Sequence, residues 1–284
     1  MKGGPAEVYP SDPAGNRRKE PAVGEAFSHP QPNPGGQVIR SMLSLAVLAA
    51  APPPAVAIDP PTNGVELIAQ MRQRYLGKWY RTLTFVQKTT LADGKVETWY
   101  EAVELPGKLR IDIAPLDRKN TLLFRNDSLY EFKGGKLAES RPMIHPLMVL
   151  GFDVYAQPVG ATARQLRALG FDLDKLHEST WQGRPAYVVG AAAGDTLTRQ
   201  FWIDKERLYF VRMVEPGKQD PSARVESRFD KYIPMGQGWL ETEVRFLVNG
   251  ETRMLEEYTE PKAGVELSPA LFDSRRWVPP GWVR

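Results

Sequence analysis

The chain changes its hydrophobic period once, shortly after residue 77. Between a Thr62-Asn63 cap and Gly77, apolar residues recur at steps of three and four. These residues are Val65, Leu67, Ile68, Met71, Tyr75 and Leu76. That spacing predicts one amphipathic helix, because residues three and four apart share a helix face.

After this helix, apolar and polar residues alternate, which is typical of strands with one buried face. Asp93-Gly94 and Pro106-Gly107 are turn sequences between the first stretches, and Gly after Asp favours a tight hairpin. The strands predicted in this part are residues 81–91, 95–105, 108–114, 120–126, 128–133 and 136–140.

The alternation stops at Pro142. Residues 143–158 have no period of two and predict a short apolar helix, and residues 160–170 predict a second one that Gly170 ends. Strands then resume, and residues 268–272 predict a final short helix. The later strands are expected at residues 172–181, 185–193, 198–204, 207–215, 222–233, 238–248 and 251–260.

This order of elements predicts an α+β fold. About eleven antiparallel strands would form one strongly curved sheet, since so many strands do not stay flat. A helix precedes the sheet, and a helical pair is inserted midway, so we expect helices against one face.

The stretch from Gln200 to Met213 could suggest an active site, because acids and bases lie among apolar residues. We interpret Asp204-Lys205-Glu206-Arg207 as a solvated hairpin loop, since catalytic carboxylates need a cleft. The two arms are apolar on both faces, which is unusual for an antiparallel strand. Either helices cover one side and a loop the other, or the sheet lines an apolar cavity.

The first part of the chain differs in composition. Met1 to Gln37 is rich in Pro, Gly and charge, which predicts disorder. An apolar run at 42–51 and Ala55-Val56-Ala57 predict a signal peptide cleaved after Ala57, with a single domain at 58–284. The alternatives are a buried segment or a membrane anchor, but the run is shorter than the ~20 residues that span a bilayer.

Composition excludes several functions. The 37 basic and 34 acidic residues nearly cancel and form no basic stripe, so we expect no nucleic-acid partner. Without cysteine there is no disulfide, thiol catalysis or cysteine-linked lipid anchor. His29, His145 and His177 lack metal-ligand spacing, and nucleotide or nucleophile motifs are absent. We therefore expect no enzyme activity, no catalytic residues, no metal and no cofactor.

Several stretches resemble one family. "FVQKTT" (85–90) is similar to its Phe-x-Gln strand, and "LPGKLRIDI" (105–113) to its Arg-Pro segment. "NTLLFRNDSLYEF" (120–132) and "FWIDKERLYFVRM" (201–213) are similar to two later hairpins. Together, in this order from Val65 to Trp277, they resemble the LolA/LolB-like carriers of outer-membrane lipoproteins and lipids.

The resemblance implies a curved half-barrel with a helical lid inserted on its concave face. The predicted signal peptide and the lack of a lipobox cysteine lead us to expect a periplasmic protein without a lipid anchor. The resemblance implies a monomer that binds acyl chains of lipoproteins or lipids. Such a protein hands them toward the outer membrane between donor and acceptor complexes. The family's lid-latching Arg stands where this chain has Leu105, so the latch is not carried over.

We expect the acyl chains to contact apolar residues of the strands and the lid, which together would form the lipid-binding site. The predicted residues are Leu83, Phe85, Trp99, Leu109, Ile111, Phe124, Met143, Leu147, Met148, Leu150, Phe201, Ile203, Val211 and Met213.

Two other classes remain open at this stage. One is a non-catalytic periplasmic interaction or signalling module with a filled core, and the other is a hydrolase with an unrecognised site. A carrier should contain a cavity of about 300 Å³ or more.

Overall fold

A computed structural model describes residues 59–283 of the chain. The predicted disordered extension, signal peptide and cleavage after Ala57 lie outside these residues and stay predictions. No helix within residues 59–283 is long and apolar enough to cross a membrane.

The predicted first helix is confirmed as α1 (Gly64–Tyr75), and the Asn63 side chain caps it by accepting a hydrogen bond from the Glu66 amide. Strands follow in the predicted order, with shifts of a few residues at their ends. The first six strands are β1 (Thr82–Leu91), β2 (Val96–Glu104), β3 (Lys108–Ile113), β4 (Asn120–Arg125), β5 (Ser128–Lys133) and β6 (Lys136–Pro142).

The helical insertion consists of α2 (Pro146–Gly151), the 3-10 helix η2 (Asp153–Tyr155) and α3 (Val159–Ala168). We call residues 143–168 the lid segment. The remaining strands of the main sheet are β7 (Leu176–Trp181), β8 (Arg184–Val189), β9 (Gln200–Asp204), β10 (Phe210–Pro216), β11 (Arg224–Asp230), β14 (Glu243–Val248) and β15 (Glu251–Ala263).

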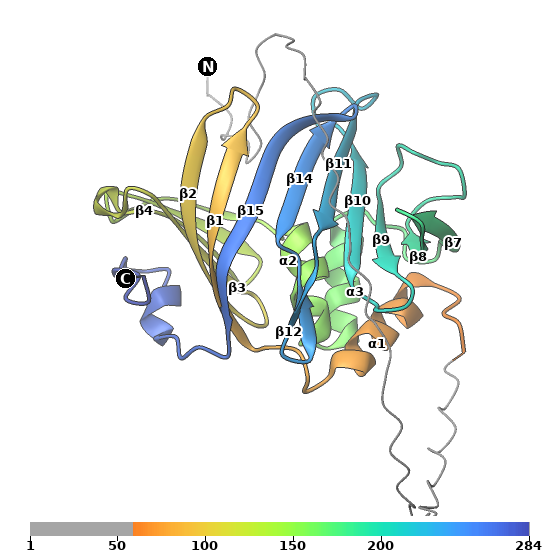
Figure 1. The fold of residues 1–284 in the computed structure, drawn as a ribbon, viewed down its shortest axis with the longest axis horizontal. Helices are drawn as coiled ribbons and strands as arrows, with labels where there is room; N and C mark the ends of the chain where they lie inside the picture. Colours follow the sequence, from red (N-terminus) through yellow and green to blue (C-terminus); the bar gives the residue numbers. More distant parts are fainter. Residues whose placement is uncertain (1–58, 284) are drawn as a thin grey trace, which may run out of the picture. The chain divides into compact units, whose positions relative to one another are not determined.

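These strands form one open antiparallel sheet, which confirms the α+β class (Figure 1). It contains thirteen strands rather than about eleven, in the order β6-β5-β4-β3-β2-β1-β15-β14-β11-β10-β9-β8-β7. Both end strands, the exposed β6 and the half-buried β7, correspond to predicted stretches and pair with one neighbour each. The first and last strands, β1 and β15, pair in the middle.

One predicted strand is broken. Residues 238–248 form two strands, because β13 (Gly238–Leu240) leaves the main sheet to pair with β12 (Ile233–Met235). Glu241 and Thr242 connect β13 to β14, and Lys231 adopts a positive φ of 54° at the other departure from the sheet. Because the backbone leaves the main sheet here, the Glu241 side chain does not follow the alternation of inward and outward positions along a strand.

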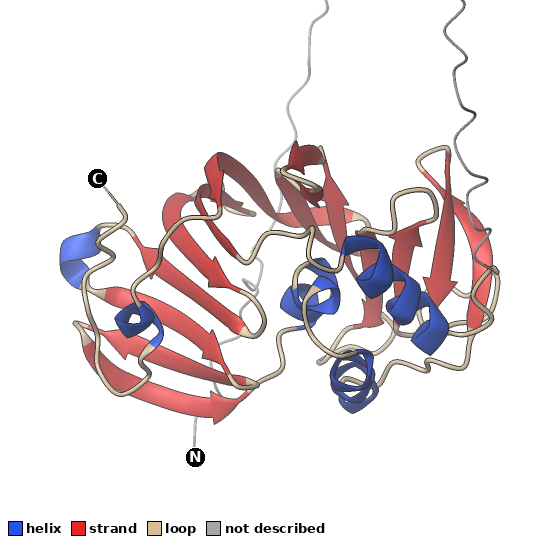
Figure 2. Ribbon diagram, turned by 90° about the horizontal axis from the view of Figure 1, so that it is seen from below, coloured by secondary structure: helices blue, strands red, loops and turns tan. Residues whose placement is uncertain are grey.

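The sheet curves around the helices (Figure 2). The main core joins α1 and the lid segment to the inward side chains of the strands. Leu67, Ile68 and Met71 of α1 are fully buried in it, at their helical spacing. Burial of this kind supplies about 25 cal/mol for each Å² of apolar surface, so the inner face holds the helices in place.

The outer face carries a second, smaller core over β2 to β5. Leu271 and Phe272 of the 3-10 helix η3 (Pro269–Phe272) pack there on Ala102, Leu123 and Phe132. In a strand, successive side chains point to opposite faces of the sheet. An apolar stretch such as 121–124 therefore places apolar side chains on both faces, and both must be covered. A segment near the C terminus covers the second face of this stretch.

A buried ion pair attaches this segment. Arg110 donates to Asp112 at 2.7 and 2.8 Å, and also to the carbonyls of Leu271 and Val278. Thr121 donates to the same Asp112 carboxylate and accepts from the Trp277 indole. Arg110 therefore fastens the outer face, on the side of β3 opposite to the lid.

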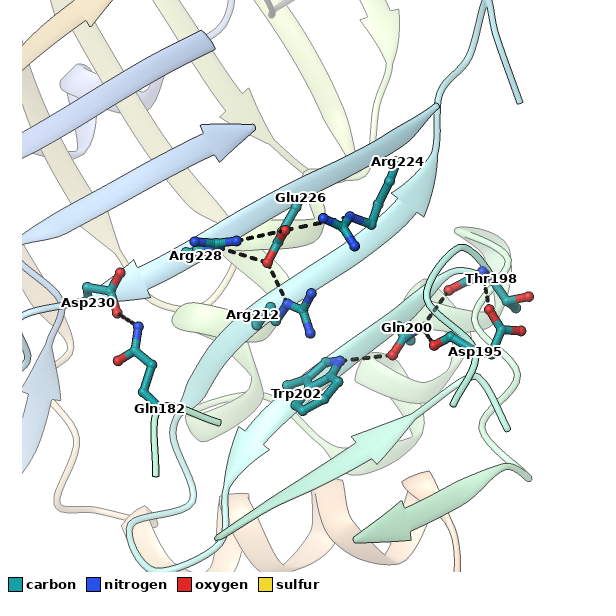
Figure 3. A network of polar contacts seen from close by, with 10 residues as sticks. All are labelled: Gln182, Asp195, Thr198, Gln200, Trp202, Arg212, Arg224, Glu226, Arg228 and Asp230. Atoms are coloured by element: carbon teal, nitrogen blue, oxygen red, sulfur yellow. Dashed lines mark hydrogen bonds and ion pairs between the residues drawn. The ribbon is translucent and has the colours of Figure 1, made fainter. Parts of the chain in front are cut away.

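A different arrangement covers the outer face of β9 to β11 (Figure 3). The guanidinium of Arg212 lies 4.6 Å from the ring centre of Trp181 and 4.7 Å from that of Trp202. Glu226 accepts hydrogen bonds from Arg212 and Arg228. Although burial opposes it, these bonds keep the pKa of Glu226 below its ordinary value. Stacked aromatic and arginine groups thus cover this arm of the hairpin without a helix.

Removal of the Arg110 side chain should cost more than removal of an exposed ion-pair partner. Arg110→Ala leaves Asp112 buried without its cation, so we expect a loss of about 3–5 kcal/mol in the free energy of unfolding. Lys88→Ala, which removes the exposed Lys88–Glu257 pair, should cost about 0–1 kcal/mol. Urea unfolding measures both, and equal losses would contradict the role of Arg110.

Candidate functional site

A pocket lies between the inner face of the sheet and the lid segment. Side chains from β1, β2, β3, β4 and β15 line it on one side, and lid residues close it on the other. Its volume is about 70 Å³. This is below the ~300 Å³ expected of a carrier, so an acyl chain would fit only if the lid segment moved outward.

The lid segment has a local reason for its shape. Pro146 occupies the first turn of α2, where its missing amide hydrogen costs nothing. The imidazole of His145 caps the same turn by accepting from the Met148 amide at 3.3 Å. Burial lowers the pKa of His145 to about 4, so this cap is neutral at physiological pH.

Several contacts anchor the lid, including hydrogen bonds from Arg72 to the Gln157 carbonyl and from Gln165 to Asp127. The Tyr155 ring stacks on Trp79 with ring centres 3.7 Å apart. Asp153 accepts a hydrogen bond of 2.7 Å from the amide of Gly107, in the turn that follows Leu105. The turn that carries the latching Arg in the resembling family is thus also joined to the lid here, through a lid carboxyl and a backbone amide.

Asp153 is fully buried, and its second oxygen has no hydrogen-bond partner among the described residues. Burial raises the pKa of Asp153 to about 7. Gly107 has a φ of 82°, a conformation that favours glycine, so the donor is held in a strained turn position that other residues disfavour.

Most of the pocket wall is apolar. Its apolar residues are Phe85, Trp99, Leu109, Ile111, Leu122, Phe124, Leu147, Met148, Phe152, Phe229, Phe246 and Met254. The wall also contains polar side chains, namely Gln87, Glu101, His145, Glu241, Glu256 and Tyr258.

The predicted lipid-binding residues divide into groups. The structure brings Phe85, Trp99, Leu109, Ile111, Phe124, Leu147 and Met148 together around the pocket. The others in the main core, away from the pocket wall, are Leu83, Met143, Leu150, Phe201, Ile203 and Met213. Lipid binding by any of these residues stays a prediction.

Val211 does not join either group. It lines a separate pocket on the other face of the sheet, with Asp204 and Trp181. A β-bulge between Phe210 and Arg212 inserts one residue, so the period of two that groups Val211 with Met213 fails here.

The hairpin loop at 204–207 is confirmed in place, but Asp204 is not solvated as predicted. It is only 3% exposed, pairs with Arg184 at 2.7 Å, and accepts from the amides of Glu206 and Arg207. Its carboxylate therefore organises the turn, a role that a short polar side chain commonly fills.

The polar residues of the pocket were not among those predicted from the sequence. A signal was present, because Gln87 follows Phe85 and Glu101 follows Trp99 by two residues, and positions two apart share a strand face. Each polar residue therefore lies on the face already chosen for lipid binding. Glu241 had no such signal, since it occupies the unpredicted break before β14.

Three carboxyls dominate this polar wall. Burial raises the pKa of Glu241 to about 8 and that of Glu256 to about 7. Burial, together with Glu256 and Glu241 nearby, holds the pKa of Glu101 well above its ordinary value. Among residues 59–283, no group of three or more His, Cys, Asp or Glu side chains is arranged to hold a metal ion.

Comparisons with known proteins agree on the arrangement of the chain alone. No protein-family model and no curated protein matches the sequence. A solved DUF1329 family protein from Desulfovibrio piger matches with 16% identity and a TM-score of 0.48, over 74% of this chain and 95% of that one.

Two further solved structures are similar. A candidate outer membrane lipoprotein-sorting protein domain from Vibrio parahaemolyticus has 13% identity and a TM-score of 0.49, over 74% of this chain and 96% of its own. A LolA superfamily protein from Nitrosomonas europaea has 12% identity and a TM-score of 0.47, over 75% and 98%.

The buried carboxyls should make stability depend on pH. Because their folded-state pKa values are raised, the folded protein binds more protons than the unfolded chain between pH 4.5 and about 8. Stability is therefore highest below this window and falls as pH rises through it, by at most roughly 1.4 kcal/mol per pH unit and group.

Urea unfolding across this pH range measures that slope. Glu241→Gln and Glu256→Gln should each flatten it, whereas Glu257→Gln, at an exposed neighbouring site, should leave it unchanged. Identical slopes in all variants would contradict the raised pKa values.

The contact between Asp153 and Gly107 should hold the lid closed. Asp153→Ala removes the acceptor, so we expect faster amide hydrogen exchange across residues 146–158 and a loss of about 1–3 kcal/mol in lid stability. Asp153→Asn keeps a side-chain acceptor and should exchange more slowly than Asp153→Ala. Exchange at the wild-type rate in Asp153→Ala would rule out the latch.

Proposed function

We propose that this protein is a periplasmic carrier that shields acyl chains of lipoproteins or lipids and passes them toward the outer membrane. The observation that supports it most is the apolar pocket between sheet and lid, whose wall includes Phe85 and Phe124 of the strands and Met148 of the lid. The signal-peptide pattern at 42–57 supports export.

Binding by such a carrier needs no covalent chemistry. An acyl chain gains about 0.8 kcal/mol for each CH₂ group that leaves water, and the sheet and lid together supply the apolar surroundings. Met148 and Met254 suit varied chain shapes, because methionine side chains are flexible and polarizable.

The lid must move for this function. The volume of about 70 Å³ accommodates only a few methylene groups, so the segment around α2 has to swing away from β3 and β4. Pro146 and Gly151 bound α2, and Asp153 makes the hydrogen bond that an outward movement would break. Tyr155, stacked on Trp79, would stay in place as the pivot.

The small volume favours a second candidate, a periplasmic interaction or signalling module with a filled core. In that function the lid would be a fixed part of the core, and the inner face would contact no ligand. The two candidates differ in whether the lid segment opens and whether an apolar ligand enters.

Native mass spectrometry of the protein purified from a bacterial membrane extract tests the proposal. We expect a bound lipid or acylated peptide. Leu122→Trp, which fills the pocket from β4, should reduce the bound fraction at least tenfold. Leu137→Trp, at an exposed position on β6, is the matched control. A folded wild-type protein that carries no such ligand would support the filled-core module instead.

A further inference from the structure

The polar wall of the pocket is assembled from separate elements. Glu101 belongs to β2 and Glu256 to β15, and these two strands flank β1, which contributes Gln87. Glu241 reaches the pocket from the break before β14. Carboxyls far apart in the chain therefore meet on one side of an otherwise apolar pocket.

Apart from Asp153 of the lid segment, the other buried acids differ from these carboxyls. Within residues 59–283, Asp112, Asp204, Glu226 and Glu243 each form an ion pair with Arg or Lys. No Lys or Arg lines the pocket. Burial and the neighbouring carboxyls of Glu256 and Glu241 raise the pKa of Glu101.

Glu241 has an additional peculiarity. Its side chain is 2% exposed, and its Oε1 atom has no hydrogen-bond partner in the described part of the chain. An unpaired buried acceptor costs about 1–3 kcal/mol, a cost that a donor on a bound ligand would remove. Glu256, by contrast, accepts from the Tyr258 hydroxyl at 2.9 Å.

We propose that this wall recognises a cationic head group with N–H donors, of the class of a protonated primary amine, on an amphipathic ligand. The inference rests on the carrier function proposed above and adds the chemistry of the ligand's polar end. An ammonium group offers three N–H donors and a positive charge. The pocket wall itself contains no Lys or Arg to pair with Glu101, Glu241 and Glu256. The apolar part of the ligand would lie along Phe85 and the lid.

The protonation of the pocket carboxyls is consistent with a preference for a cationic head group. The titratable groups that face the pocket are Glu101, Glu241, Glu256, Tyr258 and His145. Raised carboxyl pKa values keep the wall largely neutral when it faces no cation, which limits the cost of burial. A bound ammonium favours the ionised form, so binding should release protons, whereas an anionic head group keeps the carboxyls protonated and forms no ion pair with them.

Isothermal titration with octylamine, 1-octanol and octanoate at neutral pH tests the inference, because the three probes share one apolar chain. Octylamine should bind about tenfold or more tightly than 1-octanol, which corresponds to about 1.4 kcal/mol. The heat of octylamine binding should depend on the buffer, as proton release requires. Octanoate should bind most weakly.

Glu241→Gln and Glu256→Gln each reduce the charge with little change in shape. Each should lower the octylamine affinity toward that of 1-octanol and leave 1-octanol binding unchanged, and two sites keep the test open if one variant fails to fold. Glu257→Gln, the exposed neighbour on β15, should bind like wild type.

The outcomes separate the two proposals. If 1-octanol or octanoate binds as tightly as octylamine, the head-group inference is overturned and the carrier function stands. If none of the probes binds the folded protein, the carrier function fails, and the inference fails with it.

Discussion

The need to cover both faces of one large open sheet determines most of this structure. The inner face is buried by α1 and the lid segment, and the outer face of β2 to β5 by the segment around Phe272. Each cover depends on a polar attachment as well as on apolar packing. On the outer face this is Arg110 with Asp112, and on the inner face Asp153 with the Gly107 amide.

The two attachments differ in strength for a physical reason. Arg110 and Asp112 compensate each other's charge, and backbone carbonyls and Thr121 satisfy the rest. Asp153 has one donor and no cation, so its bond to Gly107 is easier to break. Of the two attachments, the outer one is therefore compensated in charge and the Asp153 bond is the weaker.

Period and turn chemistry were sufficient to predict the helix after Asn63, the strands and the inserted lid, because these depend on local alternation. These local patterns gave the wrong face where an inserted residue or a break interrupts the pairing of strands. The bulge before Arg212 moved Val211 to the other face, and the break after Leu240 placed Glu241 in the pocket. The role of Arg110 depends on contacts with carbonyls more than 150 residues away, at Leu271 and Val278, which no local pattern encodes.

The pairing of β1 with β15 has a consequence for how the chain folds. Leu83 lies opposite Ala263, so the central ladder of the sheet closes only after nearly all intervening residues have been positioned. Until then, β1 to β6 form one partial sheet, and β7 to β11 with β14 and β15 form another, each with an unpaired inner edge. Closing so long a loop carries an entropy cost that local hairpins avoid, which makes folding slow and exposes those edges to association with other chains.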